Sequence, residues 1–399
     1  MNPTLLHVTI LIKPFSIKPN MNNYKFFFSI VICVICILLN AHSSSAQKNK
    51  HIIIGYVGGF RQNIIEPSSI DAKGLSHINY AFVDIKDNRA WLHNEETDTV
   101  NFRKLNELKS INPDLKILIS IGGWTWSKNF SDAVLTDTST QNFAQSAVDI
   151  VSKYNLDGVD IDWEYPGMIG DSNVYRPEDR THYTNLFKNL REKLDALSKQ
   201  TNKKYFVTTA IGNSPEFLQH TQLEEAQKYL DYINLMSYDF NEGYDNMACH
   251  HTNLFTPDKM PYISSADVAI QNLKKIGVQL SKVVMGIAFY GKGTIVKSAD
   301  NNGLYQIPVK SVRGGGYTYL KDSVINKNGF VRYWDDASKA PYLFNAEKKI
   351  FITYDDEESV KDKCDYIKKH KLAGAMFWEY SSDKKLYLLK AIDAAFGYK

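Results

Sequence analysis

Eight short runs rich in β-branched and aromatic residues recur along the chain from residue 47 onward, each followed by a polar or helix-patterned stretch. Several runs are apolar at successive positions, as parallel strands must be when other layers cover both faces. Helix signals lie between them, such as Ser265 as a cap ahead of apolar positions 268, 270, 273 and 276. This alternation predicts an α/β protein, a (β/α)₈ TIM barrel. The predicted strands are Ile52–Val57, His77–Val83, Lys116–Ile121, Gly158–Glu164, Tyr205–Ile211, Tyr232–Met236, Val283–Tyr290 and Ala373–Trp378.

The gap between the seventh and eighth runs is far longer than one crossover helix requires. It contains the glycines Gly314–Gly316 and then three more strand-like runs, Phe330–Trp334, Pro341–Phe344 and Lys349–Tyr354. We therefore expect a small α+β insertion subdomain at residues 292–353, between the seventh and eighth strands. Residues 47–291 and 354–399 then make up the barrel.

The first 46 residues have the pattern of a secretion signal. Lys25 precedes the apolar run Phe26–Leu39, and a small-residue cleavage site follows at Ser44–Ala46. The run is too short to span a bilayer comfortably, although an uncleaved N-terminal anchor is the alternative. Met21 lies just before the signal and is a second candidate for the translation start. We expect a secreted protein, extracellular or periplasmic, with no membrane attachment after cleavage.

The charge balance argues against nucleic-acid binding. The chain has 47 Lys and Arg residues against 44 Asp and Glu, and 44% of its 399 residues are hydrophobic, enough for a large core. The excess of positive charge comes from Lys13, Lys18 and Lys25, which all lie in the predicted signal. The remaining protein is formally neutral, whereas a protein that follows the phosphate backbone needs a basic surface.

The cysteine count does not indicate a disulfide scaffold. Two of the four cysteines fall in the predicted signal, which leaves Cys249 and Cys364. Cys364 is spaced with Val360 and Ile367 as on the apolar face of a helix. This pattern favours a buried thiol, and a bridge to Cys249 is the alternative.

The segment Asp157–Pro166, at the fourth predicted strand, carries a row of acidic residues. Because side chains alternate along a strand, Asp160, Asp162 and Glu164 project from one face. The opposite face is apolar, with Val159, Ile161 and Trp163. Unpaired carboxylates are costly to bury, and the segment contains no basic residue. A chemical use is therefore favoured over a structural one.

The spacing of this row suggests how it works. Alternate Cα atoms in a strand lie roughly 6.5–7 Å apart, so full ionisation is disfavoured and a proton is shared. Glu164 is outermost, at the carboxyl end of its strand, where barrel enzymes have their active sites. A carboxyl that stays protonated near neutral pH is what a general acid needs.

Metal binding by the same oxygens is the main chemical alternative. Counted from Asp160, an EF-hand loop would need Gly at the sixth position and Glu at the twelfth, where Tyr165 and Asp171 stand. His250 and His251 are adjacent and therefore point apart. We expect neither a metal nor another cofactor.

The acidic residues at 157, 160, 162 and 164 resemble the catalytic signature of the chitinases of glycoside hydrolase family 18, and the resemblance covers nearly the whole mature chain. Four further segments resemble motifs of this family at the third, sixth, seventh and eighth strands, namely Ser120–Trp124, Met236–Asp239, Phe289–Gly291 and Gly374–Trp378. The long gap also falls where the family has its insertion.

The resemblance implies hydrolysis of β-1,4 bonds between N-acetylglucosamine units with retention of configuration, assisted by the substrate's own acetamido group. It implies that Glu164 is the general acid and then the base, and that Asp162 orients the acetamido nitrogen. Asp160 would hold the proton balance of the row, Tyr238 would donate a hydrogen bond to the acetamido oxygen, and Asp157 would be structural. The expected partner of this monomer is chitin or its oligosaccharides.

Aromatic platforms are expected in the groove, because sugar rings present apolar faces. The resemblance implies that Trp378 forms the floor under the distorted sugar. The other substrate-binding residues it implies are Tyr56, Phe82, Gly122, Gly123, Trp124, Tyr165, Met236, Asp239 and Tyr290. Trp126 and Trp334 are candidates for neighbouring subsites, although an aromatic residue in a barrel of this size more often belongs to the core, as we expect for Trp163.

Three departures from the family pattern concern the outer subsites. Lys292 stands where the family often has Arg, Tyr244 stands where Trp is common, and Cys249–His251 replaces a more usual Gly-His-Asn. None of these changes removes a member of the acidic row. Two alternatives to a chitinase remain open: a non-catalytic chitin-binding lectin on the same scaffold, and an endo-N-acetylglucosaminidase that cleaves N-glycan cores. Intact Glu164 and Asp162 favour an enzyme over the lectin.

Overall fold

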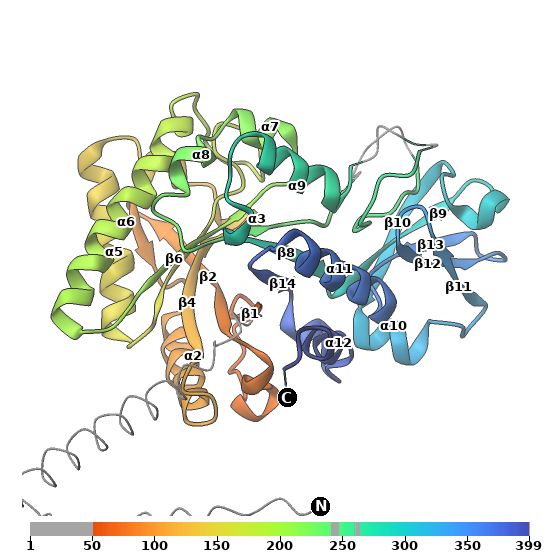
Figure 1. Cartoon of the computed structure of the whole chain (residues 1–399), viewed down its shortest axis with the longest axis horizontal. Coiled ribbons are helices and arrows are strands. Elements are labelled where there is room, and N and C mark those ends of the chain that lie inside the picture. The colour runs from red at the N-terminus through yellow and green to blue at the C-terminus, as the bar shows by residue number, and fades with distance from the viewer. Residues whose placement is uncertain (1–50, 241–246, 259, 261–263, 399) are drawn as a thin grey trace, which may run out of the picture. The chain divides into compact units, whose positions relative to one another are not determined.

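Eight parallel strands form a closed barrel in the computed structural model, which describes residues 51–398 except 241–246, 259 and 261–263 (Figure 1). Neighbouring strands follow the order β1-β14-β8-β7-β6-β5-β4-β2, and β1 also pairs with β2, which closes the ring. The predicted (β/α)₈ barrel is thus confirmed. Its strands are β1 (Ile52–Gly58), β2 (His77–Lys86), β4 (Lys116–Gly122), β5 (Gly158–Asp162), β6 (Phe206–Ile211), β7 (Tyr232–Leu235), β8 (Val283–Ala288) and β14 (Gly374–Trp378).

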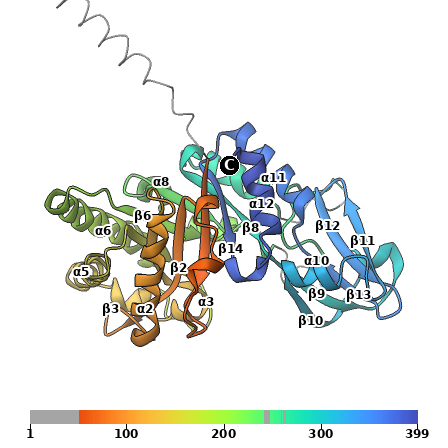
Figure 2. The ribbon, with the colours of Figure 1, turned by 90° about the horizontal axis from the view of Figure 1, so that it is seen from below.

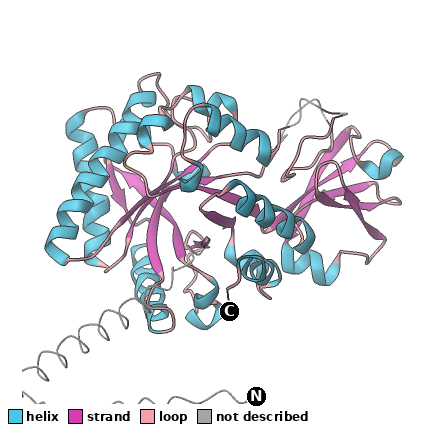
Figure 3. Ribbon diagram, in the orientation of Figure 1, coloured by secondary structure: helices cyan, strands magenta, loops and turns pink. Residues whose placement is uncertain are grey.

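Helices surround the strands (Figures 2 and 3). The longer ones are α2 (Glu95–Glu107), α5 (Asp137–Lys153), α6 (Asp179–Thr201), α9 (Ala266–Lys275), α11 (Glu357–His370) and α12 (Tyr387–Phe396). Short helices follow several strands, namely α3 (Gly123–Trp126), α4 (Phe130–Ala133), α7 (Pro215–Gln219) and α8 (Leu223–Ala226). Ser265 caps α9 as predicted, because its side chain accepts a hydrogen bond from the Val268 N–H. Within the described ranges, none of the helices has the length and apolar character needed to cross a bilayer. The predicted signal at residues 1–46 lies outside the described residues.

The barrel strands bury both faces, which explains their apolar sequences. One face of β5 contributes Val159 and Ile161 to the large core between strands and helices, and Trp163, directly after the strand, joins them, as the alternation predicted. Side chains on the inner faces form a second, smaller cluster that includes Ile54, Val284 and Met376. Polar groups can therefore occupy the barrel interior only where other polar side chains pair with them.

The chain leaves the barrel after β8 and forms a five-stranded antiparallel sheet before returning at β14 (Figure 1). Its strands pair in the order β10-β9-β13-β12-β11. The elements are β9 (Tyr290–Val296), β10 (Pro308–Gly316), α10 (Tyr317–Ser323), β11 (Phe330–Asp335), β12 (Ala340–Asn345) and β13 (Ile350–Thr353). A three-residue strand, β3 (Arg89–Trp91), pairs separately with β2. We propose that this five-stranded sheet with α10 is the insertion subdomain; β9 starts ahead of the predicted boundary at residue 292.

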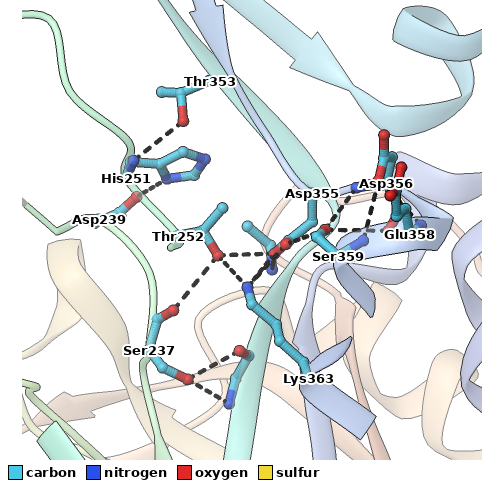
Figure 4. A network of polar contacts seen from close by, with 12 residues as sticks. Ser237, Asp239, His251, Thr252, Thr353, Asp355, Asp356, Glu358, Ser359 and Lys363 are labelled. Atoms are coloured by element: carbon cyan, nitrogen blue, oxygen red, sulfur yellow. Dashed lines mark hydrogen bonds and ion pairs between the residues drawn. The ribbon is translucent and has the colours of Figure 1, made fainter. Parts of the chain in front are cut away.

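A buried ion pair fastens α11 to the barrel (Figure 4). Lys363 Nζ lies 2.6 Å from Asp355 Oδ2 and 2.7 Å from Thr252 Oγ1, and the side chains of Lys363 and Asp355 are fully buried. Asp355 Oδ2 also accepts a hydrogen bond from the Ala288 N–H at 3.2 Å, and its Oδ1 accepts one from the Ser359 hydroxyl at 2.7 Å. One carboxylate thus joins α11, the end of β8 and the segment after β7.

Both cysteines of the described chain are buried, and no disulfide is formed between them. Cys364 lies on the buried face of α11 with Val360 and Ile367, as the spacing predicted. Burial raises the pKa of its thiol to about 12, which makes Cys364 an inert core residue.

Candidate active site

A cavity of about 720 Å³ lies where the barrel strands reach their carboxyl ends. Twelve of the residues predicted for the site line it: Tyr56, Phe82, Gly122, Trp124, Asp162, Glu164, Tyr165, Met236, Tyr238, Asp239, Tyr290 and Trp378. These residues come from six different barrel strands or the segments that follow them and from the start of β9. The closed barrel therefore brings together side chains that are far apart in the sequence.

Asp160 lies within the barrel and is fully buried. Its Oδ2 accepts hydrogen bonds from the hydroxyls of Ser120 at 2.7 Å and Tyr56 at 2.9 Å. Its Oδ1 accepts hydrogen bonds from the hydroxyl of Thr208 at 2.5 Å and the Asn234 amide at 3.2 Å. Burial raises the pKa of Asp160, and these donors oppose that shift by stabilising the carboxylate. Four donors from four strands thus hold this carboxyl group in place.

Asp162 ends β5 and faces the cavity. The residue is 4% exposed, and its Oδ1 has no hydrogen-bond partner among the described side chains and backbone groups. Burial raises its pKa well above the ordinary range, and the negative charges of Glu164 and Asp160 raise it further. One buried oxygen of this carboxyl therefore keeps hydrogen-bonding capacity that none of the described protein groups uses.

Glu164 follows the end of β5 and also lines the cavity. Its backbone N–H donates to Ser127 Oγ at 2.9 Å, which fixes the segment after the strand. Burial raises the pKa of its carboxyl to about 7. The hydrogen bond with Tyr165 opposes this shift, whereas the negative charge of Asp239 adds to it. Glu164 can therefore be protonated at near-neutral pH, as a general acid must be.

Asp239 lies across the cavity from the row and receives several donors on one oxygen. Its Oδ1 accepts a hydrogen bond from the Tyr290 hydroxyl at 2.6 Å and lies 2.9 Å from Lys292 Nζ and 3.2 Å from His251 Nδ1. Its side chain remains 39% exposed. This carboxylate is a fixed negative charge at the cavity wall.

Tyr238 places its ring at the cavity wall and is 6% exposed. Its hydroxyl lies 3.8 Å from Met376 Sδ, a weak acceptor. Burial raises its pKa well above the ordinary value, and the charge of Asp162 raises it further, so the phenol stays protonated and can donate a hydrogen bond into the cavity.

Aromatic rings form one wall of the cavity. The Trp378 ring is stacked with Phe82 at 5.5 Å between centroids and with Phe60 at 5.9 Å, and Tyr56 packs against it at 5.9 Å. Trp124 is 53% exposed and offers a further aromatic surface. Such flat apolar surfaces suit the apolar faces of sugar rings.

The two glycines after β4 allow close approach of neighbouring groups. Gly122 has φ +107°, and a Cβ there would lie 2.3 Å from the carbonyl oxygen of Asp162. A Cβ on Gly123 would lie 2.6 Å from the Phe82 ring. Gly123 is thus a packing position behind the wall and is not itself among the lining residues.

Trp126 and Trp334, the two candidates for neighbouring subsites, have different positions. Trp126 lines the cavity and stacks on His93 at 4.8 Å between ring centroids. Trp334 lies on β11 under the Arg332 guanidinium and is not among the lining residues. Trp163 is buried in the core, as predicted.

Sequence reasoning missed several lining residues, of which Phe60 and Asn213 are the most informative. Phe60 follows β1 in an irregular segment, and its only signal was its position soon after a barrel strand. The Asn213 amide donates to the carbonyl oxygens of Met236 and Tyr238 at 2.8 and 2.9 Å. It thereby fixes the backbone around Tyr238, a role that becomes visible only once β6 and β7 are paired.

The side chains of the cavity are not arranged as a metal site. Among the described residues, no three His, Cys, Asp or Glu side chains gather in a group that could hold a metal ion.

Comparison with known proteins gives one consistent family. The family model of the glycosyl hydrolases family 18 matches residues 52–383. Chitinase A1 of Niallia circulans is 36% identical over 93% of this chain, which spans 62% of that protein's length, and Chitinase B of Serratia marcescens is 31% identical over 82% of this chain and 77% of its own. A solved family 18 N-acetylglucosaminidase from Paenibacillus barengoltzii matches with a TM-score of 0.80 and 38% identity, over 86% of this chain and 99% of that one. With the matched region covering the whole barrel and its cavity, the chain belongs to glycosyl hydrolase family 18.

Proposed function

We propose that this protein is a secreted chitinase that hydrolyses β-1,4 bonds between N-acetylglucosamine units of chitin or its oligosaccharides. The observation that carries the proposal is the pairing of Glu164, whose pKa is raised to about 7, with Asp162, which also lines the cavity and whose buried Oδ1 has no described hydrogen-bond partner. A proton donor and a neighbouring carboxyl that can receive a substrate group are what substrate-assisted cleavage requires. The chitinase names of its relatives support the same substrate class.

In the proposed reaction, Glu164 donates its proton to the glycosidic oxygen of the departing sugar. The substrate's acetamido oxygen attacks the anomeric carbon, the bond to the leaving oxygen breaks, and an oxazolinium ion forms. Glu164, now a carboxylate, takes a proton from the incoming water, which opens this intermediate. Because the anomeric carbon is attacked twice from alternate sides, its configuration is retained.

Asp162 accepts a hydrogen bond from the acetamido N–H and stabilises the positive charge that develops on the nitrogen. Asp160, held by its four donors, supplies a second negative charge behind it. The protonated phenol of Tyr238 donates to the acetamido oxygen and orients it for attack. Trp378 supports the sugar ring at which the bond is cleaved.

The first test is hydrolysis of N-acetylglucosamine tetramer to hexamer by the purified protein, with the product anomers followed by NMR. We expect products that are initially β-anomers, and no effect of EDTA. Binding without cleavage would favour the lectin alternative, whereas cleavage of an N-glycan core in place of chitin oligomers would favour the endo-N-acetylglucosaminidase. Release of single sugars would instead indicate that this protein is an N-acetylglucosaminidase, the activity in the name of the similar Paenibacillus barengoltzii protein.

The pH dependence of kcat/KM gives a second prediction. The active form of Glu164 is the protonated one, and its pKa is raised to about 7. As the pH rises above this value the protonated fraction falls tenfold per unit, so kcat/KM should decline with that slope on the alkaline side. Initial rates on the pentamer between pH 4 and 9 measure this limb. An alkaline limb near the ordinary pKa of a glutamate, at 4–5, would contradict the assignment.

A further inference from the structure

His251 lies behind the cavity wall, where it contacts two lining residues, Asp239 and Tyr290. Its side chain is 3% exposed, and its Nδ1 lies 3.2 Å from Asp239 Oδ1. Its N–H donates to Thr353 Oγ1 on β13 at 3.1 Å, and its carbonyl accepts from the Phe240 N–H at 3.0 Å (Figure 4). The imidazole also packs on the Tyr290 ring at 5.3 Å between centroids.

The residue that follows makes this position more rigid. Thr252 belongs to the buried network of Lys363 and Asp355, which anchors it to α11 and to the end of β8 (Figure 4). The backbone that carries His251 is therefore held next to a fully buried ion pair. This arrangement holds a titratable ring against a carboxylate of the cavity wall.

Two basic side chains meet on the same carboxylate. Asp239 is contacted by His251 and by Lys292. Unlike the ammonium group of Lys292, an imidazole can change its charge in the physiological pH range. Burial pushes the pKa of Asp239 up, but the hydrogen bond and charge of His251, with the charge of Lys292, bring it well below its usual range.

The charge on Asp239 is felt by the catalytic acid. Burial raises the pKa of Glu164, the hydrogen bond with Tyr165 opposes this shift, and the negative charge of Asp239 adds to it. A positive imidazole on Asp239 offsets part of this negative charge. The groups that face His251 are Asp239 from the segment after β7, Tyr290 and Lys292 from β9, and Thr353 from β13.

We propose that His251 is a positioning residue that acts through Asp239 to set the pH range in which Glu164 can deliver a proton. The inference rests on the proposed function for its consequence in catalysis. A protonated His251 compensates Asp239 and eases proton release from Glu164, whereas an uncharged side chain leaves Glu164 facing a stronger negative charge. Glu164 then keeps its proton to higher pH.

The variant His251→Asn tests this directly, because an amide can keep the donor to Asp239 but cannot titrate. We expect the alkaline limb of kcat/KM to move to higher pH by about half a unit or more, with KM for the pentamer within twofold of the wild-type value. His250→Asn is the matched control, because His250 contacts Asp335 on β11, 3.2 Å away, and not Asp239. Superimposed limbs for His251→Asn and wild type, at equal melting temperature, would overturn the proposal.

A second measurement does not depend on chitinase activity. Coupling between two ionisations is reciprocal, so removing the charge of Glu164 must change the titration of His251. In ¹⁵N-histidine-labelled protein, we expect the imidazole signal that His251→Asn removes to titrate at lower pH in Glu164→Gln than in wild type. Equal midpoints overturn the inference even if chitin is cleaved, and a shift without chitin cleavage leaves the coupling standing while the proposed function fails.

Discussion

Glu164→Gln is expected to lower kcat on N-acetylglucosamine oligomers by roughly 10²–10⁴-fold, the usual contribution of a general acid and base. Glutamine has the same shape as the protonated carboxyl but cannot transfer a proton to the glycosidic oxygen. Because burial keeps Glu164 protonated up to about pH 7, the substitution exchanges one neutral group for another, and the fold should lose little stability. Binding of the pentamer by calorimetry should therefore persist.

Steady-state rates measure this effect, and Glu347→Gln is its control, since Glu347 is exposed in the turn between β12 and β13. A Glu164→Gln protein that binds the pentamer and retains more than a tenth of the wild-type kcat would remove Glu164 from the mechanism. Loss of binding together with a lowered melting temperature would point to damage of the cavity and would require Glu164→Asp as a replacement.

Lys363→Ala is expected to destabilise the protein by about 3–5 kcal/mol, the cost of leaving a buried carboxylate without its cation. Asp355 would keep only the hydrogen bonds from Thr252, Ser359 and the Ala288 N–H. Its burial without a cation would then favour local opening at the junction between α11 and β8. Urea unfolding followed by tryptophan fluorescence measures the loss.

Two comparisons show whether the lost charge is responsible. Lys361→Ala removes a neighbouring lysine of the same helix whose partner Asp365 is exposed, and should change stability by less than about 1 kcal/mol. The double variant Lys363→Met with Asp355→Leu removes both charges and should recover much of the stability. If Lys363→Ala unfolds at the wild-type urea concentration, the ion pair contributes nothing to the fold.

The barrel could be predicted because its signals are local. Runs such as His77–Val83 and Lys116–Ile121 are short, apolar and separated by helix patterns, and they fall within β2 and β4. The boundary between β8 and β9 was harder to predict. The apolar run Val283–Tyr290 contains all of β8 and the first residue of β9, and the chain changes sheet at Phe289, whose N–H donates to the Trp378 carbonyl. The position at which the chain changes sheet depends on where the partner strand ends.

The strands β9 and β10 were missed for a related reason. Residues 292–293 and 314–316 are Lys and Gly positions, which lack the alternation of a half-buried strand. Pairing of β9 with both β10 and β13 overrides this weak preference, with irregular register near Arg313. The sequence pattern could not show these neighbours.

In the candidate site, too, features with a local sequence signal could be predicted, whereas features that depend on strand pairing could not. The acidic row was predictable because a period of two places Asp160, Asp162 and Glu164 on one face. The donors to Asp160 come from β1, β4, β6 and β7, and only the register of the closed sheet brings them to one carboxyl. The convergence of His251 and Lys292 on Asp239 likewise depends on β9 lying beside the segment after β7.

The pairing of β1 with β14 has a consequence for biosynthesis. It joins Ile52 to Gly374, so the first strand made by the ribosome has to wait for nearly the whole polypeptide before its neighbour emerges. Until then β1 and β8 each present an unpaired backbone edge, the kind of surface on which chains aggregate. A polypeptide released early, before residue 374, would keep both edges open. Incomplete translation products of this gene should therefore be hazardous to the producing cell, and their removal a matter of quality control.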